Sequence, residues 1–279
     1  MAEATPHRSA GRAAAFGVRV KTPAARAVSV NGLPCRVWEA GEGDPLGVLA
    51  GLGGTPRWTP FLERLAERHR VIVPSLPGFP GALGHDRLDD LSDWVSATLD
   101  LLEGAGLDGA DLVGCSVGGM LAAEVAAFSR ATVRRLVLVS PFGLFDAREP
   151  VADPFARKPR EVPELLCSRP EAFAAQREAP PGVDHAAGVI TLARADEAAA
   201  RLLWPLGDRG LAKRLHRIRV PTRIVWGERD PVIPPSYAER FAGGLGARAD
   251  VLLISEAGHL VDLDQPEHLA RAVEEFLRS

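Results

Sequence analysis

Short, strongly apolar runs alternate with stretches of helical periodicity along most of this chain. Runs of branched apolar residues predict strands buried on both faces, whereas apolar positions spaced by three and four predict helices that cover a sheet. The alternation is typical of an α/β fold, a mostly parallel twisted sheet with helices on both faces. The expected strands are residues 28–30, 35–38, 47–50, 70–74, 110–114, 133–139, 222–226 and 250–254, and the expected helices are residues 61–69, 91–102, 117–128, 236–245 and 267–277.

The first pair of expected strands differs from the rest. Residues 28–30 and 35–38 flank the dipeptide Asn31-Gly32. Asn-Gly readily adopts the positive φ angles of a tight hairpin turn. We therefore expect the sheet to begin with an antiparallel pair and to continue with parallel strands.

The alternation of strands and helices breaks after Pro141. Residues 142–210 are rich in Pro and Ala, contain helical fragments at 163–166, 171–177 and 197–204, and have no strand pattern. A segment of this length is too long for an ordinary loop, so we expect a helical cap, or lid, inserted over the sheet. The predicted division is a flexible lead-in at residues 1–26, a core formed by residues 27–141 and 211–279, and a cap at residues 142–210.

Composition and charge narrow the classes of function. The net charge of −3 provides no broad cationic field for nucleic acid or an anionic membrane surface, so we expect neither as a partner. No apolar run approaches the roughly 20 residues that cross a bilayer. The cysteines Cys35, Cys115 and Cys167 lack the paired spacing of a zinc or redox site, which favours a reducing, cytoplasmic compartment. The sequence also predicts no cofactor and no metal, and it leaves the oligomeric state open.

The strongest chemical signal is the run G-C-S-V-G-G at residues 114–119, between an expected strand and an expected helix. A G-x-S-x-G sequence at such a junction forms a sharp, strained turn. Small neighbours there let the helix lie close to the strand while the serine hydroxyl is presented to substrate. Ser116 is therefore the candidate nucleophile, and we interpret Cys115 as a packing residue.

A serine hydroxyl is a weak nucleophile at neutral pH, so it needs a neighbouring base and a third group that orients the base. Asp230 and His259 each follow directly after one of the last two expected strands. The order Ser, Asp, His, each beyond the end of its own strand, predicts a triad of Ser116, Asp230 and His259. Asp146 and Glu228 stay open as alternative acids.

These motifs resemble those of lidded α/β-hydrolase-fold serine hydrolases, and the similarity runs over residues 27–279. The family's acid motif W-G-x-x-D-x-x-x-P matches residues 226–234 with Asp230 as the acid, and its G-H after the last strand matches Gly258 and His259. The resemblance implies the same roles for these positions in an esterase-like enzyme. It says little about the substrate.

Acyl transfer also requires hydrogen-bond donors aimed at the oxyanion of the transition state. We expect the backbone N–H of Val117 to be one donor and the N–H of Leu52, in the glycine-rich run at residues 49–54, to be the other. The family usually has His-Gly where this chain has Ala50-Gly51. The missing imidazole removes a possible brace of this loop.

Substrate contacts are less well marked. Trp58, His85 and Trp204 are candidate pocket residues, and His185 is a further possibility. The expected reaction is hydrolysis of an ester-like bond (carboxylic ester, lactone or thioester) in a small, mostly uncharged substrate through an acyl-enzyme. The alternatives are a C–C bond hydrolase or an acyltransferase on the same triad, and, outside catalysis, a ligand-binding receptor with the hydrolase fold.

Overall fold

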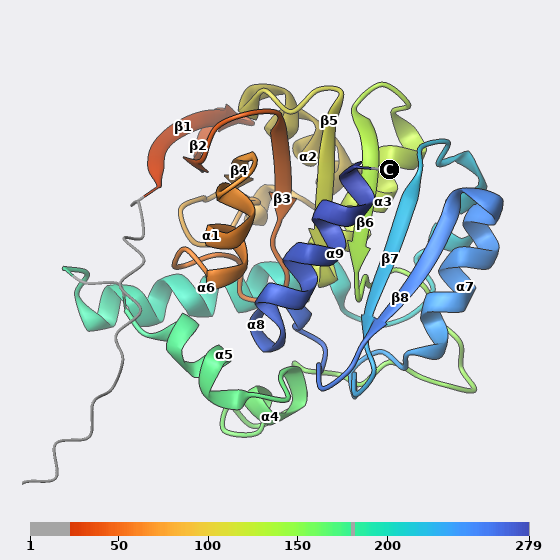
Figure 1. Cartoon of the computed structure of the whole chain (residues 1–279). Helices are drawn as coiled ribbons and strands as arrows, with labels where there is room; N and C mark the ends of the chain where they lie inside the picture. The colour runs from red at the N-terminus through yellow and green to blue at the C-terminus, as the bar shows by residue number, and fades with distance from the viewer. Residues whose placement is uncertain (1–22, 180–181, 279) are drawn as a thin grey trace, which may run out of the picture.

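The computed structural model describes residues 23–179 and 182–278. Within them one sheet of eight strands has the order β1-β2-β4-β3-β5-β6-β7-β8, with helices on both faces (Figure 1). From β3 onward, neighbouring strands along β4-β3-β5-β6-β7-β8 are parallel. The predicted fold class is therefore confirmed. The strands are β1 (Ala24–Val30), β2 (Leu33–Ala40), β3 (Pro45–Leu49), β4 (Arg70–Pro74), β5 (Ala110–Cys115), β6 (Val133–Val139), β7 (Thr222–Gly227) and β8 (Ala249–Ile254).

The sheet begins with the predicted hairpin. Strands β1 and β2 pair antiparallel across Asn31 and Gly32, whose φ angles are 50° and 77°. Both values are those of the tight turn that Asn-Gly favours. Strand β2 also pairs antiparallel with β4. Because β1 already begins at Ala24, the last residues of the predicted lead-in belong to the sheet, and residues 1–22 lie outside the described residues.

Two hydrophobic layers cover the two faces of the sheet. Successive side chains of a strand point to opposite faces, so on β5 the side chain of Leu112 joins the core beneath α2, α3 and α7, whereas that of Val113 joins the core beneath α1, α8 and α9. Figure 1 shows α1, α8 and α9 together in front of the sheet. These helices are α1 (Pro60–Ala66), α2 (Leu91–Ala105), α3 (Ser116–Phe128), α7 (Ser236–Leu245), α8 (Val261–Asp264) and α9 (Pro266–Arg278).

The segment predicted as a cap contains three α-helices among its described residues, α4 (Val162–Leu166), α5 (Pro170–Arg177) and α6 (His185–Leu203). They lie beyond the edge of the sheet at which the arrows of β5 and β6 end (Figure 1). The predicted start of the last helical fragment, residue 197, was wrong. The helix begins at His185 because the Asp184 side chain caps it by accepting a hydrogen bond from the N–H of Ala187.

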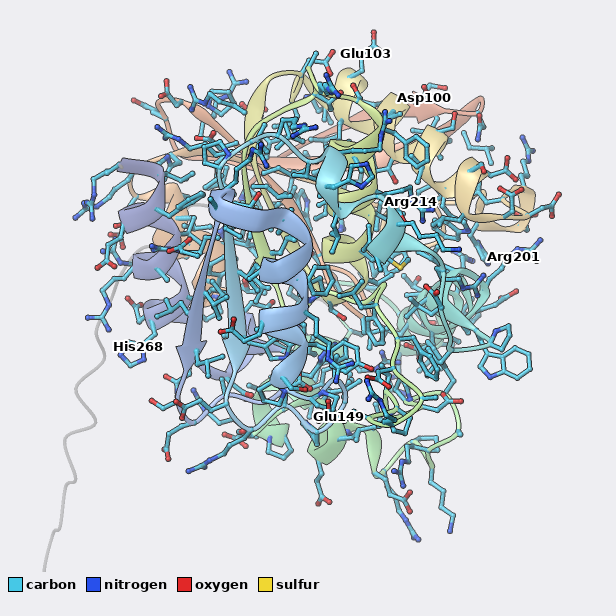
Figure 2. All side chains as sticks on the ribbon, turned by 90° about the vertical axis from the view of Figure 1, so that its right-hand side faces the viewer. Asp100, Glu103, Glu149, Arg201, Arg214 and His268 are labelled. Carbon is cyan, nitrogen blue, oxygen red and sulfur yellow. The ribbon has the colours of Figure 1, made fainter. Side chains whose placement is uncertain are left out.

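Most charged side chains lie on the outside, but several acidic residues are buried, and Glu124 is one of them. Asp100, Glu103 and His268 are exposed and point outward (Figure 2). Glu124, on α3, is fully buried, and its carboxylate accepts hydrogen bonds of 2.7 and 2.6 Å from the guanidinium of Arg214. This pair joins the chain that follows the cap to the helix that begins at Ser116.

No helix among the described residues is both long enough and apolar enough to span a bilayer.

Candidate active site

Ser116 lies at the junction of β5 and α3, and its backbone has a φ angle of 51°. This left-handed conformation is unusual for a residue with a side chain and marks a strained turn. The turn is possible because its neighbours are glycines. A Cβ on Gly118 would lie 2.5 Å from the carbonyl oxygen of Ala50, and one on Gly114 would lie 2.7 Å from the Cα of Gly119.

Ser116, His259 and Asp230 form one hydrogen-bonded line. The Oγ of Ser116 lies 2.8 Å from Nε2 of His259, and Nδ1 of the same ring lies 2.9 Å from Oδ2 of Asp230. All three residues are buried, at 1%, 1% and 5% exposure. With the Nδ1–H tautomer, the ring donates to the carboxylate while Nε2 accepts from the serine hydroxyl. This geometry permits removal of the serine proton.

The second oxygen of Asp230 fixes the carboxylate in place. Oδ1 accepts the backbone N–H groups of Val232 and Ile233 at 2.9 and 3.0 Å. The carbonyl oxygen of Ile233 in turn accepts the indole N–H of Trp226 at 3.1 Å. The spacing between Trp226 and Asp230 therefore has a structural reason, because the tryptophan braces the loop that holds the carboxylate in place.

The two alternative acids have other surroundings. Glu228 is exposed, and the only hydrogen bond described for it is that of its backbone N–H to the carbonyl oxygen of Ile254. Asp146 is bound by the guanidinium groups of Arg148 and Arg240, and these bonds, those of Arg148 first, hold the pKa of its carboxyl well below the usual range. The carboxylate bonded to His259 is that of Asp230.

The glycine-rich loop after β3 packs directly against the serine. A Cβ on Gly51 would lie 3.0 Å from the Cβ of Ser116. The N–H of Gly54 closes a turn onto the carbonyl oxygen of Gly51 at 3.0 Å, with Gly53 at a φ of 85°. The guanidinium of Arg36 donates to the carbonyl oxygen of Thr55 at 2.7 Å and so braces the end of this loop. Leu52 thus lies on a constrained turn beside Ser116.

A cavity of about 500 Å³ separates this loop from the cap segment. Its volume is in the range of small-molecule sites. The guanidinium of Arg177, which lines it, is paired with both carboxylate oxygens of Asp196, at 3.0 and 2.6 Å. The walls are mostly apolar: Leu52, Gly53, Pro154, Phe155, Arg157, Pro159, Val162, Pro163, Leu166, Phe173, Ala174, Arg177 and Asp196.

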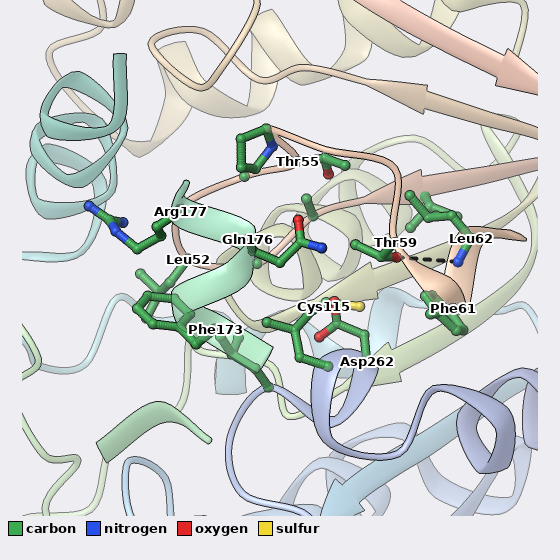
Figure 3. Close-up of a pocket in the computed structure, with 18 residues that line it drawn as sticks. Leu52, Thr55, Thr59, Phe61, Leu62, Cys115, Phe173, Gln176, Arg177 and Asp262 are labelled. Atoms are coloured by element: carbon green, nitrogen blue, oxygen red, sulfur yellow. Dashed lines mark hydrogen bonds between the residues drawn. The ribbon is translucent and has the colours of Figure 1, made fainter. Parts of the chain in front are cut away.

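A smaller cavity is also lined by the glycine-rich loop and by α5 (Figure 3). The carboxyl of Asp262 and the thiol of Cys115 lie at one end of it, and Gln176 of α5 also lines it. Burial raises the pKa of Asp262 to about 6, the main effect, with a smaller contribution from the charge of Asp264. Burial also raises the pKa of the Cys115 thiol well above its ordinary value, which fits the packing role predicted for it.

The three predicted substrate contacts, Trp58, His85 and Trp204, are not among the residues that line the 500 Å³ cavity. Trp58 packs edge-on against Trp38 of β2, with ring centroids 6.3 Å apart. His85 is buried, with Nε2 3.6 Å from the carboxylate of Glu197 on α6. Trp204 is 60% exposed. Their contact with substrate stays a prediction.

Phe142 is a neighbour of the triad that the sequence analysis did not identify. Its ring lies edge-on to the imidazole of His259, with centroids 5.3 Å apart, and its N–H donates to the carbonyl oxygen of Ser116 at 3.2 Å. It directly follows Pro141 at the end of β6. Since that end lies at the same sheet edge as Ser116, its position after the strand was a usable signal.

Among residues 23–179 and 182–278, no group of three or more His, Cys, Asp or Glu side chains is arranged to hold a metal ion.

Comparison with known proteins places this geometry in a family. The alpha/beta hydrolase family matches residues 48–272, so the chain belongs to the alpha/beta hydrolase family. One relative is the dihydrolipoyllysine-residue acetyltransferase component of the acetoin cleaving system of Pseudomonas putida, 32% identical over 92% of this chain and 70% of that protein. Another is 2-hydroxymuconate semialdehyde hydrolase of Pseudomonas sp. (strain CF600), 26% identical over 90% of this chain and 93% of that protein.

Solved structures share the fold. A membrane phospholipase A described as a bacterial virulence factor has a TM-score of 0.75 at 24% identity, covering 92% of this chain and 86% of that one. The meta-cleavage product hydrolase CumD has a TM-score of 0.72 at 20% identity, covering 91% and 97%. The family supports a hydrolase, and the named activities of its members differ too much to define a substrate.

Proposed function

We propose that the protein is a serine hydrolase that cleaves an ester-like bond, a carboxylic ester, lactone or thioester, through an acyl-enzyme. Ser116 attacks the carbonyl carbon while His259 takes the hydroxyl proton and then returns it to the leaving alcohol or thiol. Water, activated by the same imidazole, releases the acyl group and restores the serine. Asp230 keeps the ring oriented and stabilises its charged form.

The observation that carries this proposal is the unbroken line from the Oγ of Ser116 through His259 to Asp230, with distances of 2.8 and 2.9 Å. A histidine with a purely structural role in the core requires neither of these partners. Here one ring nitrogen faces a serine with a strained backbone, and the other faces a carboxylate that also accepts two backbone N–H groups. The same three groups argue against a pure ligand receptor, because binding alone requires none of them.

For the oxyanion we propose the backbone N–H groups of Leu52 and Val117. Val117 lies in the first turn of α3, where N–H groups have no partner within the helix and the helix dipole favours negative charge. Leu52 lies on the constrained turn whose Gly51 touches Ser116. Preorganised donors of this kind are worth about 3 kcal/mol each in the transition state.

For the substrate we propose a small, mostly uncharged molecule with an apolar acyl group. The 500 Å³ cavity supports this, because its walls include Phe155, Val162, Leu166 and Phe173. The charge of Arg177 there is already matched by a carboxylate. An apolar acyl chain gains about 0.8 kcal/mol for each CH₂ buried in such a site.

The test is hydrolysis of p-nitrophenyl butyrate by the wild-type chain and by the Ser116→Ala variant. We expect turnover by the wild type, its loss in the variant, and an unchanged thermal unfolding midpoint. Ser140→Ala is a matched control, because Ser140 is also buried beyond the end of a strand and also has a positive φ. Equal turnover by Ser116→Ala and the wild type would contradict the proposal.

A second candidate, C–C bond hydrolysis or acyl transfer on the same triad, is favoured by the names of the relatives. These include 2-hydroxymuconate semialdehyde hydrolase and an acetyltransferase component. Product analysis separates the possibilities. A diketone-like substrate cleaved to an acid and a ketone supports the first, and acyl transfer to an added thiol in preference to water supports the second.

For the compartment we propose the cytoplasm. The three cysteines are buried free thiols, which is the usual state in a reducing environment.

A further inference from the structure

Asp264 has a position that the sequence analysis did not anticipate. It lies two residues ahead of Pro266, the first residue of α9, and its carboxylate accepts hydrogen bonds from three backbone N–H groups outside that helix. Oδ2 accepts the backbone N–H of Gly258 at 2.7 Å and that of Ser168 at 2.8 Å, and Oδ1 accepts the N–H of Arg169 at 2.8 Å. The residue is 1% exposed.

These three donors belong to two different parts of the molecule. Gly258 directly precedes His259, whereas Ser168 and Arg169 form the junction between α4 and α5 in the cap segment. A fourth bond runs beside them, from the N–H of Leu260 to the carbonyl oxygen of Leu166 at 2.9 Å. The residues on either side of His259 are therefore both tied to the same short piece of the cap.

The contact leaves little room for a side chain at Gly258. A Cβ on Gly258 would lie 3.1 Å from the backbone nitrogen of Ser168 and 3.2 Å from Oδ2 of Asp264. A buried carboxylate is stable only when hydrogen bonds replace its lost hydration. Two of the three N–H groups, those of Ser168 and Arg169, supply these bonds only while the cap segment rests on the loop of His259.

We propose that Asp264 is a positioning residue that couples the cap to the catalytic histidine. Through the N–H of Gly258 it holds His259 in line with Ser116, and through Ser168 and Arg169 it makes that alignment depend on the closed cap. When the cap segment moves away, the carboxylate loses two of its three donors. This inference rests on the proposed function of the triad.

The burial of the nucleophile agrees with such coupling. Ser116 and His259 are each 1% exposed, so substrate entry requires the surrounding segments to move. Leu166 lines the 500 Å³ cavity, and its carbonyl oxygen accepts the N–H of Leu260, the residue after His259. It thus connects the cavity wall to the loop of the histidine. The imidazole is then fully aligned only while the cap is closed, so substrate that enters when the cap is open meets the aligned triad once the cap has closed again.

The first test is the Asp264→Asn variant. An asparagine offers one acceptor oxygen, and its NH₂ group faces a backbone N–H. We expect kcat for p-nitrophenyl butyrate to fall roughly 100-fold, as for a small displacement of a catalytic group, with KM within about twofold of wild type. Asp90→Asn is the control, because Asp90 also accepts two backbone N–H groups, at the start of α2, and should leave kcat unchanged.

The second variant, Gly258→Ala, keeps the charge of Asp264 and inserts a methyl group between the same groups. It should lower kcat in the same way. In both variants the far-downfield proton NMR signal of the His259 Nδ1–H, which reports the bond to Asp230, should weaken or disappear in protein that circular dichroism shows to be folded. A merely structural loss of stability would leave that signal in the folded fraction.

Two results overturn the inference. One is wild-type kcat in folded Asp264→Asn, and the other is an unchanged downfield signal in both variants. Failure of the proposed function looks different, because then the wild-type chain itself would turn over no ester and Ser116→Ala would change nothing. The NMR signal would still report whether Asp264 positions His259.

Discussion

Gly227 and Gly258 lie backbone to backbone where the loops that carry Asp230 and His259 meet. A Cβ on Gly227 would lie 2.1 Å from the carbonyl oxygen of Gly258 and 2.5 Å from that of Ala257. The N–H of Arg229 also donates to the carbonyl oxygen of Ala257 at 2.9 Å. The glycine after the tryptophan is therefore what lets the acid approach the histidine.

Gly227→Ala should accordingly lower both stability and activity. We expect the free energy of unfolding to fall by about 3 kcal/mol, because the atoms that the new methyl group would clash with are backbone atoms, which cannot rotate away. Ester turnover should fall as well, because the clash separates the two loops. Gly243→Ala, on α7, is the control. A Cβ there meets nothing within 4 Å, so this variant should gain roughly 0.5–1 kcal/mol. Urea unfolding of both variants measures the difference, and equal stabilities would refute the close packing.

The choice of Asp230 as the acid predicts a sharp contrast among carboxylates. Asp230→Asn should reduce kcat by roughly 10²- to 10⁴-fold, because an amide no longer stabilises the charged ring or fixes its tautomer. Glu228→Gln and Asp146→Asn, at the two alternative positions, should keep nearly full kcat. Steady-state kinetics on one ester decides among the three carboxylates. A large loss of kcat in Asp146→Asn would mean that the catalytic acid is Asp146, in the segment after β6.

Asp262 predicts a pH dependence of stability. Burial raises its pKa from 3.8 to about 6, so between these values the folded chain binds more protons than the unfolded chain. The contribution of Asp262 to the free energy of unfolding is then largest below about pH 4. It falls by about 1 to 3 kcal/mol as the pH rises through 6.

Asp262→Asn removes that loss. The variant should be more stable than wild type at pH 8, with the difference shrinking toward zero at pH 4, as measured by urea unfolding at both values. Asp100→Asn, an exposed position, controls for the general loss of a charge. A difference from wild type that does not change with pH would contradict the buried carboxyl.

The cavity predicts selectivity for acyl length. Ala174 lines it and Ala175 does not, so Ala174→Trp should lower kcat/KM for p-nitrophenyl octanoate about tenfold or more and leave the acetate ester nearly unchanged. Ala175→Trp should affect neither. The ratio of the two esters' kcat/KM values is the measurement, and the same ratio in both variants would mean that acyl chains lie elsewhere.

The sequence was sufficient for those parts of the fold that local chemistry decides. Asn31-Gly32 specifies its own turn, and the branched apolar run of residues 136–139 favours a buried strand. The approach of Ser116, Asp230 and His259 to one another was predictable for the same reason, because each follows directly after a strand and parallel strands end at one edge.

What the sequence could not give depends on contacts between distant segments. Helix α6 reaches back to His185 through an Ala-rich run whose cap, Asp184, looks like any loop aspartate. The hydrogen bonds of Asp264 to Ser168 and Arg169 join residues almost a hundred positions apart, and no local sequence pattern predicts them. Trp204 shows the converse, since an indole typical of a pocket wall lies mostly exposed.

The central claim is that the hydroxyl of Ser116 is the group acylated during turnover. Labelling the folded wild-type chain with a fluorophosphonate, followed by peptide mapping, tests it most directly. We expect a single adduct on Ser116, formed at least tenfold more slowly when His259 is replaced by glutamine. An adduct on another residue, or ester hydrolysis that continues after Ser116 has been labelled completely, would contradict it.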